Sequence, residues 1–187
     1  AWGAANGCRT SNASFTVGQS NAIDAAYQTA YQTNGIVNFA AAGNGSTNSL
    51  SYPSSAPFVT SVAALDSSGG RASFSNWGTG LDISAPGSGI LTLDRTGANG
   101  YTSSDMVSAN GTSFASPYSA GVAALFLSAH PFATQVEMLA AVLQGAVDLG
   151  AAGYDTNYGY GFINAYNTIT EPSPADDFCG NATVIAT

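Results

Sequence analysis

Short apolar runs bounded by glycine or small polar residues alternate along this chain with stretches of helical periodicity. The run at residues 36–42 predicts a strand buried on both faces of a parallel sheet, and two further strands are expected at residues 59–65 and 81–87, separated by Gly/Ser loops. Residues 20–34 instead repeat their apolar positions every three or four residues, which predicts a helix with Ser20 as its N-cap. A helix joined by a tight turn to a buried strand is half of an α/β unit, so the pattern indicates an α/β fold.

Two further helices are expected in the second half of the chain. Residues 113–129 are rich in alanine and nearly free of charge, which predicts a helix inside the domain, with Pro117 tolerated near its start. Residues 134–137 read Thr-Gln-Val-Glu and form a capping box. We therefore expect them to open an amphipathic, external helix that ends at Gly145.

The composition changes after Thr170. Residues 1–170 have the length and apolar content of one domain, whereas residues 171–177 read Glu-Pro-Ser-Pro-Ala-Asp-Asp, which is typical of an acidic, proline-rich linker. The residues beyond the linker are too few to fold alone. We expect residues 171–187 to be this linker and the start of a further module that the chain does not contain.

Charge is scarce on this chain, and most of it is negative. Only 7% of the residues are charged, three arginines stand against eleven acids, and the formal net charge is −8. Three scattered cations cannot neutralise a run of phosphates, so we expect neither nucleic acid nor an anionic membrane surface as a partner. No apolar stretch is long enough for a membrane-spanning helix. An acidic composition without lysine is typical of a secreted, extracellular protein.

A serine stands at the expected start of the apolar helix. Residues 110–117 read Asn-Gly-Thr-Ser-Phe-Ala-Ser-Pro and place Ser113 at the helix N-terminus. Free backbone N–H groups and the positive end of the helix dipole stabilise a developing oxyanion at such a position, and Gly111 leaves room for a substrate carbonyl. Taken alone, a serine there is more often only a helix cap.

An asparagine stands at the end of the first predicted strand. Residues 43–45 read Gly-Asn-Gly and present the Asn44 amide at the carboxyl end of that strand, where ligands of open parallel sheets bind. By itself, an asparagine beside glycine is more often part of a turn.

Together and in this order, the two segments resemble the subtilisin-like serine peptidases, the subtilase family. The resemblance extends from the first residues to about Asn167, and the block around Ser113 is its most specific part. It implies a three-layer αβα fold with a mostly parallel sheet, present here as a partial domain. The other matching segments are residues 41–44, 52–53, 62–66, 71–78, 81–87, 121–125 and 159–165.

The resemblance also implies an activity, which is hydrolysis of internal peptide bonds through an acyl-enzyme on Ser113. Asn44 would donate its side-chain amide to the oxyanion. The backbone N–H of Ser113 and the hydroxyl of Thr112 would assist it.

Substrate binding follows from the same resemblance. Residues Ala1, Trp2 and Gly3 would match the edge strand that pairs with an extended polypeptide substrate. One wall of the primary specificity pocket would be formed by Ala41, Ala42 and Gly43, and Trp2 would make the other side bulky and apolar. This lining favours an apolar or aromatic side chain before the cleaved bond.

The triad partners of the serine are not in this chain. In subtilases the Asp and His precede the segment that residues 1–3 match. The only histidine, His130, follows Ser113 by a helix length, roughly 25 Å at 1.5 Å per residue, so we expect a surface or helix-capping role for it. The resemblance therefore implies a fragment that is inactive alone, because an unassisted serine is a weak nucleophile, and that needs the missing N-terminal part of its own domain.

Two functions from other classes stay open at this point. The chain could be a non-catalytic subtilisin-like module used for binding or scaffolding, although the intact Ser113, Asn44 and Gly111 argue against it. A serine esterase of the α/β-hydrolase type would need a Gly-x-Ser-x-Gly elbow and a downstream histidine, and Ser113 lacks that frame.

A cation site is a further implication of the resemblance. Relatives bind a cation with backbone carbonyls that match Ser54, Ala56 and Val59, near a carboxylate that matches Asp82, and oxygen ligands suit Ca²⁺ or Na⁺. It is equally open that Asp82 merely ends a strand. No organic cofactor is expected.

The two cysteines lie near opposite ends of the chain. Cys8 and Cys179 match no metal or redox spacing. They could pair with each other, and Cys179 could equally bond to a residue beyond position 187.

Overall fold

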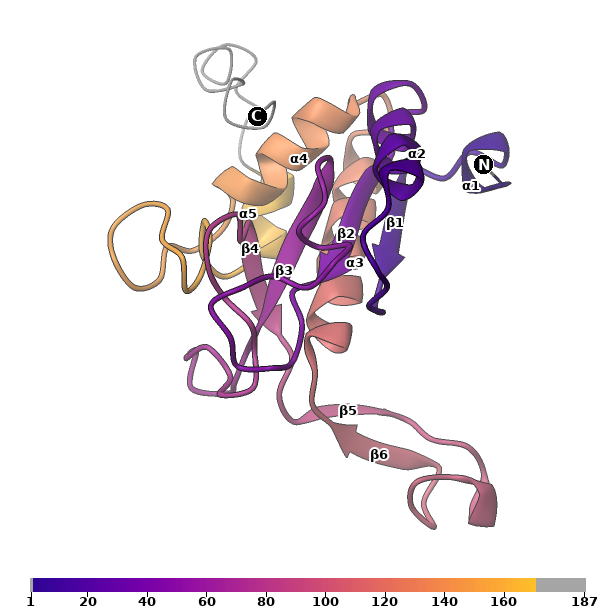
Figure 1. Cartoon of the computed structure of the whole chain (residues 1–187), viewed down its shortest axis with the longest axis vertical. Helices are drawn as coiled ribbons and strands as arrows, with labels where there is room; N and C mark the ends of the chain where they lie inside the picture. The colour runs from indigo at the N-terminus through magenta and orange to yellow at the C-terminus, as the bar shows by residue number, and fades with distance from the viewer. Residues whose placement is uncertain (1, 171–187) are drawn as a thin grey trace.

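The central element of the protein is a four-stranded parallel sheet. The computed structural model describes residues 2–170, and Figure 1 shows the sheet between layers of helices. The strands stand in the order β1-β2-β3-β4, so the sheet order follows the chain order. The three predicted strands are confirmed, and β1 is an additional one. The bounds are β1 Thr10–Ala13, β2 Val37–Ala41, β3 Val59–Leu65 and β4 Ile83–Pro86.

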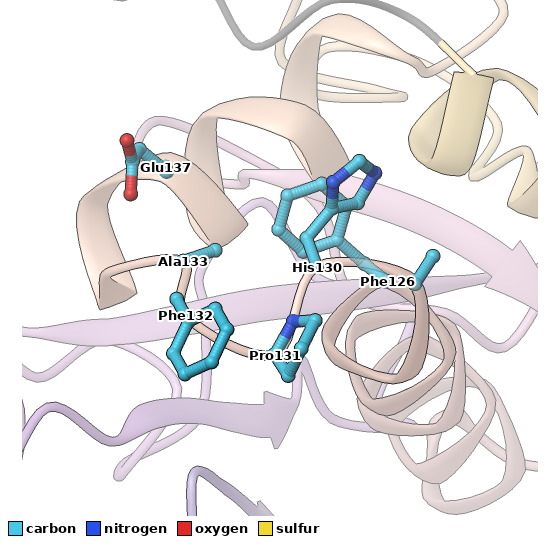
Figure 2. A pocket seen from close by; sticks show the side chains of 7 residues that line it. Phe126, His130, Pro131, Phe132, Ala133 and Glu137 are labelled. Carbon is cyan, nitrogen blue, oxygen red and sulfur yellow. The ribbon is translucent and has the colours of Figure 1, made fainter.

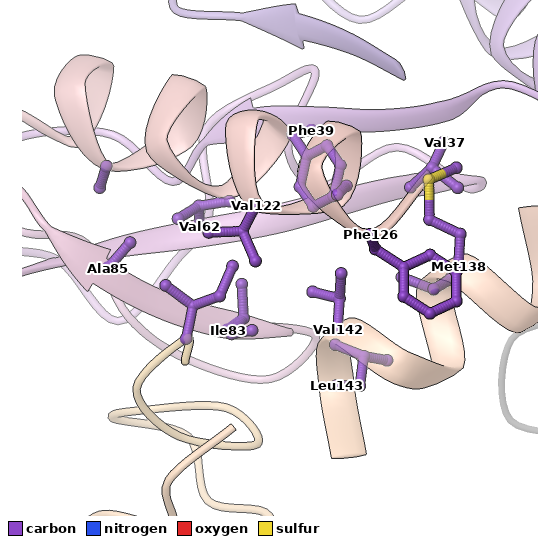
Figure 3. Close-up of a cluster of buried hydrophobic side chains, with 14 of the residues drawn as sticks. Val37, Phe39, Val62, Ile83, Ala85, Val122, Phe126, Met138, Val142 and Leu143 are labelled. Atoms are coloured by element: carbon purple, nitrogen blue, oxygen red, sulfur yellow. The ribbon is translucent and has the colours of Figure 1, made fainter. Parts of the chain in front are cut away.

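Helices cover both faces of the sheet, which confirms the three-layer αβα architecture. On one face lies α2, whose residues Ile23 and Tyr27 pack against the buried cluster that contains Ala40 of β2. On the other face, side chains of the sheet such as Phe39 and Ile83 meet those of the remaining long helices in one buried cluster (Figure 3). The helices are α2 Asn21–Gln32, α3 Thr112–Ala129, α4 Gln135–Gln144 and the short α5 Ala165–Thr170.

Helix α3 is buried on one side only. The helix contacts all four strands, and its own residues Ala115, Val122 and Phe126 are buried. Tyr118 and Leu125, on the other side, are 48% and 46% exposed. The prediction of a helix inside the domain is therefore wrong for this second side, since no described residue covers it.

Helix α4 is more buried than its sequence predicts. Its capping box is confirmed, because the Thr134 hydroxyl accepts the Glu137 N–H at 3.2 Å while Glu137 accepts the Thr134 N–H at 2.7 Å. The helix also ends at Gly145 as expected. However, all six residues from 138 to 143 are buried, because α3 and α5 pack beside it and β2 lies beneath it. The expectation of an external, amphipathic helix is wrong.

The first residues form a helix and not the expected edge strand. Helix α1 spans Trp2–Ala5 and pairs with no strand among the described residues. Its turn is closed by the Asn6 N–H, which donates to the carbonyls of Trp2 and Gly3 at 3.1 Å, and by the Asn6 side chain. Alanines favour such a turn over an extended strand.

A two-stranded arm extends away from the sheet before α3 begins (Figure 1). Strands β5 (Ile90–Leu93) and β6 (Met106–Ala109) pair antiparallel, and the 3₁₀ turn η1 (Gly97–Asn99) lies between them. Leu91 and Leu93 are exposed on the arm. None of the helices within residues 2–170 combines the length and apolarity needed to cross a membrane. The expected linker at 171–187 lies outside the described residues.

Candidate active site

The start of α3 meets the carboxyl ends of the sheet strands around a small cavity. The cavity has a volume of about 80 Å³. It brings together five residues that the sequence assigned to the site, namely Ser113, Thr112, Asn44, Ala41 and Gly43. Segments up to 99 residues apart in the chain thus form one site. The rest of the lining is Ser14, Phe15, Thr16 and Ser51.

The Asn44 side chain is held in one orientation by Thr112. Its Oδ1 accepts hydrogen bonds from the Thr112 backbone N–H and from the Thr112 hydroxyl, both at 2.9 Å. The same hydroxyl accepts the Gly43 N–H at 3.2 Å. Because the carbonyl side of the Asn44 amide is occupied, its NH₂ group is left to donate elsewhere.

The Thr112 hydroxyl orients the Asn44 amide. It donates to Asn44 Oδ1 at 2.9 Å, so Thr112 positions the side chain that carries the donor. The role at the oxyanion that the resemblance implies for this hydroxyl stays a prediction.

Two hydrogen-bond donors converge on the space beside Gly111. A Cβ placed on Gly111 would lie 3.6 Å from Asn44 Nδ2 and 3.6 Å from the Ser113 amide nitrogen. Ser113 is the second residue of α3, where a helix has no internal acceptor for the N–H. The Gly111 backbone has φ 157° and ψ 149°, which favours glycine. Convergent donors at a helix N-terminus form a binding site for a developing negative oxygen.

The loop that carries Asn44 is fixed by a buried amide, Asn76. Its Oδ1 accepts the N–H groups of Gly45 at 2.8 Å and Thr47 at 3.3 Å, and its backbone N–H donates to Gly43 at 2.9 Å. A side chain on Gly43, at φ 110°, would collide with the Ser51 hydroxyl and with the Asn76 amide. The loop is thus rigid where the donor projects from it.

The end of β1 is tied to the start of α3. The Ser14 hydroxyl donates to the Ser113 carbonyl at 2.8 Å, and the Ser116 hydroxyl donates to Asn12 Oδ1 at 2.6 Å. Beyond β1, the backbone groups of Phe15 and Thr16 make no hydrogen bond within residues 2–170. This segment, which lines the cavity together with Ala41 and Gly43, therefore presents free backbone N–H and C=O groups.

Residues 14–16 accordingly occupy the place that the sequence assigned to residues 1–3. Trp2 is 76% exposed in α1, and neither it nor Gly3 lines the cavity. The assignment failed because the run Thr-Ser-Asn-Ala is too polar to be noticed as a strand, so the edge that follows it was missed.

Ala42 also lies elsewhere than expected. It is fully buried beside Ala63 and Leu81. Successive side chains of an extended chain point in opposite directions, so only its neighbours Ala41 and Gly43 face the cavity.

No described residue can take a proton from Ser113. Its hydroxyl makes no hydrogen bond within residues 2–170, and the cavity has no titratable side chain other than those of serine and threonine. His130 is the C-cap of α3, at the opposite end of the 18-residue helix, where its ring lies 4.6 Å from that of Phe126 (Figure 2). This confirms the expected surface and capping position of His130.

Asp82 lies just before β4, away from the nucleophile. Its Oδ2 accepts two hydrogen bonds from Ser61, one from the backbone N–H at 2.6 Å and one from the side-chain hydroxyl at 2.8 Å. Burial raises the pKa of Asp82 to about 6, against the lowering effect of these hydrogen bonds. The hydroxyl of Ser54 is buried without a partner among residues 2–170. Within that range, no three acidic, histidine or cysteine side chains gather as a metal cluster.

The fold and the site together define a class, the three-layer αβα proteins that place a serine at a helix N-terminus beside an asparagine at the end of a sheet strand. The model of the subtilase family matches residues 1–161. The chain therefore belongs to the subtilase family.

Individual relatives agree with this. Subtilisin DY of Bacillus licheniformis is 39% identical over 172 residues, which are 87% of this chain and 57% of that protein. An extracellular protease of Xanthomonas campestris is 40% identical over 131 residues, which are 70% of this chain and 23% of that protein. The chain thus spans about half, or less, of the length of the curated relatives it matches.

Solved structures share the fold. A protease of Pseudoalteromonas arctica superposes with a TM-score of 0.76 at 32% identity, covering 86% of this chain and 50% of its own. The prenylagaramide maturation protease PagA also gives 0.76, at 30% identity, covering 90% of this chain and 63% of its own.

Proposed function

We propose that this chain supplies the nucleophile and the oxyanion hole of a serine endopeptidase. The observation that carries the proposal is the convergence of Asn44 Nδ2 and the Ser113 N–H on one space beside Gly111. A binding or scaffolding module would need neither donor. Family membership and the relatives described as proteases support the same activity.

The geometry fits the steps of acyl transfer. The Ser113 Oγ forms a bond to the carbonyl carbon of the substrate, and the carbonyl π electrons move to its oxygen. The resulting oxyanion is stabilised by Asn44 Nδ2 and the Ser113 N–H. When the oxyanion collapses, the C–N bond breaks and the peptide amine leaves with a proton.

The protons require groups that residues 2–170 do not place at the site. A histidine oriented by an aspartate would take the Ser113 proton and then give it to the amine. We propose that both come from polypeptide outside this chain, docked on the side of the site that Ser113 faces. The chain alone then lacks turnover.

The substrate is an extended polypeptide that runs along residues 14–16. The cavity between this edge and Ala41 is about 80 Å³, and the Ser51 side chain lines it. We therefore propose that the substrate residue before the cleaved bond has a small, uncharged side chain. This replaces the apolar or aromatic side chain that the resemblance implied. In a chimera that adds the preceding part of subtilisin DY to this chain, Ser51→Gly should enlarge the cavity and raise the ratio of kcat/KM for a Phe over an Ala substrate.

The setting of the activity is extracellular. The Xanthomonas relative is described as an extracellular protease, and this chain has the acidic, lysine-free composition expected of a secreted protein.

A chimera tests the proposed activity. It joins the part of subtilisin DY that precedes its match to this chain to the first matched residue of this chain. We expect no peptide hydrolysis by the 187-residue chain, but hydrolysis by the chimera together with labelling of Ser113 by a fluorophosphonate. A folded chimera that is labelled elsewhere, or a chain that hydrolyses peptides through Ser113 unaided, would contradict the proposal.

We also propose a structural cation, Ca²⁺ or Na⁺, held by the carbonyls of Ser54, Ala56 and Val59 near Asp82. The partnerless Ser54 hydroxyl and the raised pKa of the Asp82 carboxyl support a site of oxygen ligands. The cation would stabilise the loop between β2 and β3. Adding CaCl₂ or NaCl after dialysis should raise the Tm of the wild-type chain, and Asp82→Asn should weaken this response. An equal response of both proteins to either salt would contradict the site.

A further inference from the structure

Five asparagines of this chain are followed directly by glycine. Asparagine is a thermolabile residue, and a following glycine has no side chain to hinder attack by its amide nitrogen on the asparagine side chain. The five asparagines are all exposed, so exposure does not distinguish them. What differs is the hydrogen bonding of the glycine N–H that would attack. The five are Asn6, Asn34, Asn44, Asn99 and Asn110.

The glycine after Asn34 stands apart from the other four. Gly35 is the one whose backbone N–H has no acceptor within residues 2–170. The other four N–H groups donate as follows: Gly7 to the Ala4 carbonyl at 3.3 Å, Gly45 to Asn76 Oδ1 at 2.8 Å, Gly100 to the Gly97 carbonyl at 3.1 Å and Gly111 to the Gly87 carbonyl at 2.8 Å.

The end of α2 explains why Gly35 is left out. The backbone N–H and the side-chain NH₂ of Asn34 both donate to the Thr29 carbonyl at 3.2 Å. The Ile36 N–H donates to the Ala30 carbonyl at 2.9 Å. Gly35 lies between these donors, at φ 67°, where the chain turns away from the helix. The turn thus uses the N–H groups on both sides of Gly35 and leaves its own N–H without an acceptor.

The asparagine side chains differ in the same sense. In the part of the chain that the structure describes, Asn34 Oδ1 accepts no hydrogen bond, and only its NH₂ group is held. By contrast, Asn44 Oδ1 accepts two hydrogen bonds from Thr112 at 2.9 Å. Asn110 Oδ1 accepts the Gly89 N–H at 2.6 Å and the Ser88 hydroxyl at 3.2 Å. Neither of these two side chains can turn toward the next backbone nitrogen without breaking such bonds.

We propose that Asn34 is a modification site of this chain, which deamidates through attack by the Gly35 amide, and that the fold protects Asn44 from the same reaction. Asn76 is the protecting residue, because it holds the Gly45 N–H. The proposal does not depend on the proposed function, since it concerns the covalent stability of two asparagines and not what they bind.

The reaction needs only water. The Gly35 amide nitrogen loses its proton to solvent and forms a bond to Cγ of Asn34. The bond between Cγ and Nδ2 then breaks, and Nδ2 leaves as ammonia after taking a proton from solvent. The product is a five-membered succinimide. Water opens this ring at either carbonyl, which gives aspartate or isoaspartate in place of asparagine.

Both products change the end of α2. The new carboxylate cannot donate to the Thr29 carbonyl, and it lies at the negative end of the helix dipole. Isoaspartate also lengthens the backbone by a methylene group between α2 and β2. Because each product carries a new negative charge, ion exchange separates the modified chain from the unmodified one.

Peptide mapping of the 187-residue chain tests the site. After incubation at mildly alkaline pH, trypsin cleaves at the three arginines and leaves Asn34 and Asn44 in residues 10–71. Electron-transfer fragmentation then locates aspartate and isoaspartate. We expect Asn34 to react first and Asn6 second. Asn44 and Asn110 should react more slowly than Asn34 by about tenfold or more, because the following N–H must first leave its acceptor.

The same incubation in urea supplies the matched reference. Unfolding releases all five glycine N–H groups, so the five rates should become similar. Asn34→Gln, which cannot form the five-membered ring, should remove the early modification from residues 10–71 of the folded chain. An unmodified Asn34 while another pair reacts first, or the same order of rates with and without urea, would overturn the proposal.

Two variants of Asn76 test the protection of Asn44 separately. Asn76→Ala removes the acceptor of the Gly45 N–H and should raise the rate at Asn44 by about tenfold, whereas Asn76→Asp keeps an acceptor oxygen and should not. Asn34 is the internal reference, because its rate should stay unchanged in both folded variants. An unchanged rate at Asn44 in a folded Asn76→Ala chain would overturn the protection. If Asn76→Ala unfolds, all five rates will match those in urea, and the wild-type ratio of the Asn44 rates with and without urea decides.

Discussion

The two ends of α3 carry the candidate nucleophile and the only histidine of the chain, and the surroundings of these two residues differ. At its start, Ser113 lies among strand ends, next to Asn44 and an unpaired helix N–H. At its end, His130 caps the helix at the surface and faces a backbone carbonyl. The only histidine of the chain is thus placed where it cannot assist the serine.

Backbone direction explains the difference. All four sheet strands run parallel, so their carboxyl ends and following loops gather at one edge. Helix α3 begins at that edge and brings N–H groups with partial positive charge to it, whereas its last turn offers carbonyls. The position of an oxyanion site is therefore fixed by the polarity of helix and sheet, and the position of a titratable side chain is not.

The largest expected effect separates the two ends by activity. In the chimera with subtilisin DY, Ser113→Ala should reduce kcat by about 10⁶, as loss of the nucleophile does in subtilisin. His130→Ala should leave kcat unchanged, because no described contact joins it to the site. Steady-state kinetics on a peptide p-nitroanilide measure both. A large loss of kcat in a folded His130→Ala chimera would break the comparison.

Stability separates two neighbours near the end of α3. Phe126 is 1% exposed and Leu125 is 46% exposed. Phe126→Ala should lower the free energy of unfolding by about 3–5 kcal/mol through the cavity it leaves. Leu125→Ala should change it by less than about 0.5 kcal/mol. Urea unfolding of the 187-residue chain measures both. A similar cost for the two changes would mean that the outer face of α3 is buried in solution, for example against a second molecule.

The pH dependence of stability tests the buried carboxyl of Asp82. Its folded pKa, about 6, exceeds the value of 3.8 for a free aspartate carboxyl, so the folded state holds the proton more tightly. The stabilisation is therefore complete below about pH 4 and is lost as the pH rises to about 6, with a total on the order of 2–3 kcal/mol.

Asp82→Asn should remove this decline between pH 4 and pH 6, because asparagine does not titrate. Urea unfolding at several pH values, in buffer depleted of Ca²⁺ and Na⁺, provides the measurement. An identical pH profile for the wild type and the variant would contradict the raised pKa.

Much of the fold follows from local pattern. Strands β2, β3 and β4 coincide with mostly apolar runs, because both of their faces are covered. The capping box of α4 is a local signal that the structure confirms. Burial of whole helices was harder to predict. Burial depends on which neighbours pack against a helix, and the sequence does not show these neighbours. The sequence therefore predicted too much burial for α3 and too little for α4.

A site residue could be predicted where a single short segment of sequence determines its position. Ser113 and Asn44 stand on short motifs with defined backbone geometry, and the structure brings them together as expected. The substrate edge at residues 14–16 could not be found from the sequence, because the strand β1 before it is polar. Only two hydrogen bonds between this segment and α3 reveal its place. The Ser14 hydroxyl donates to the Ser113 carbonyl, and the Ser116 hydroxyl donates to Asn12. The role of Thr112 depends on a single hydroxyl proton, which sequence does not orient.

The kcat of the Asn44→Ala chimera tests the central claim most directly. If Asn44 Nδ2 and the Ser113 N–H bind the oxyanion, kcat should fall by about 10²–10³, the loss measured for this donor in subtilisin, while KM changes little. The interaction is made only in the transition state, so ground-state binding should persist. An unchanged kcat, or a loss confined to KM, would contradict the account.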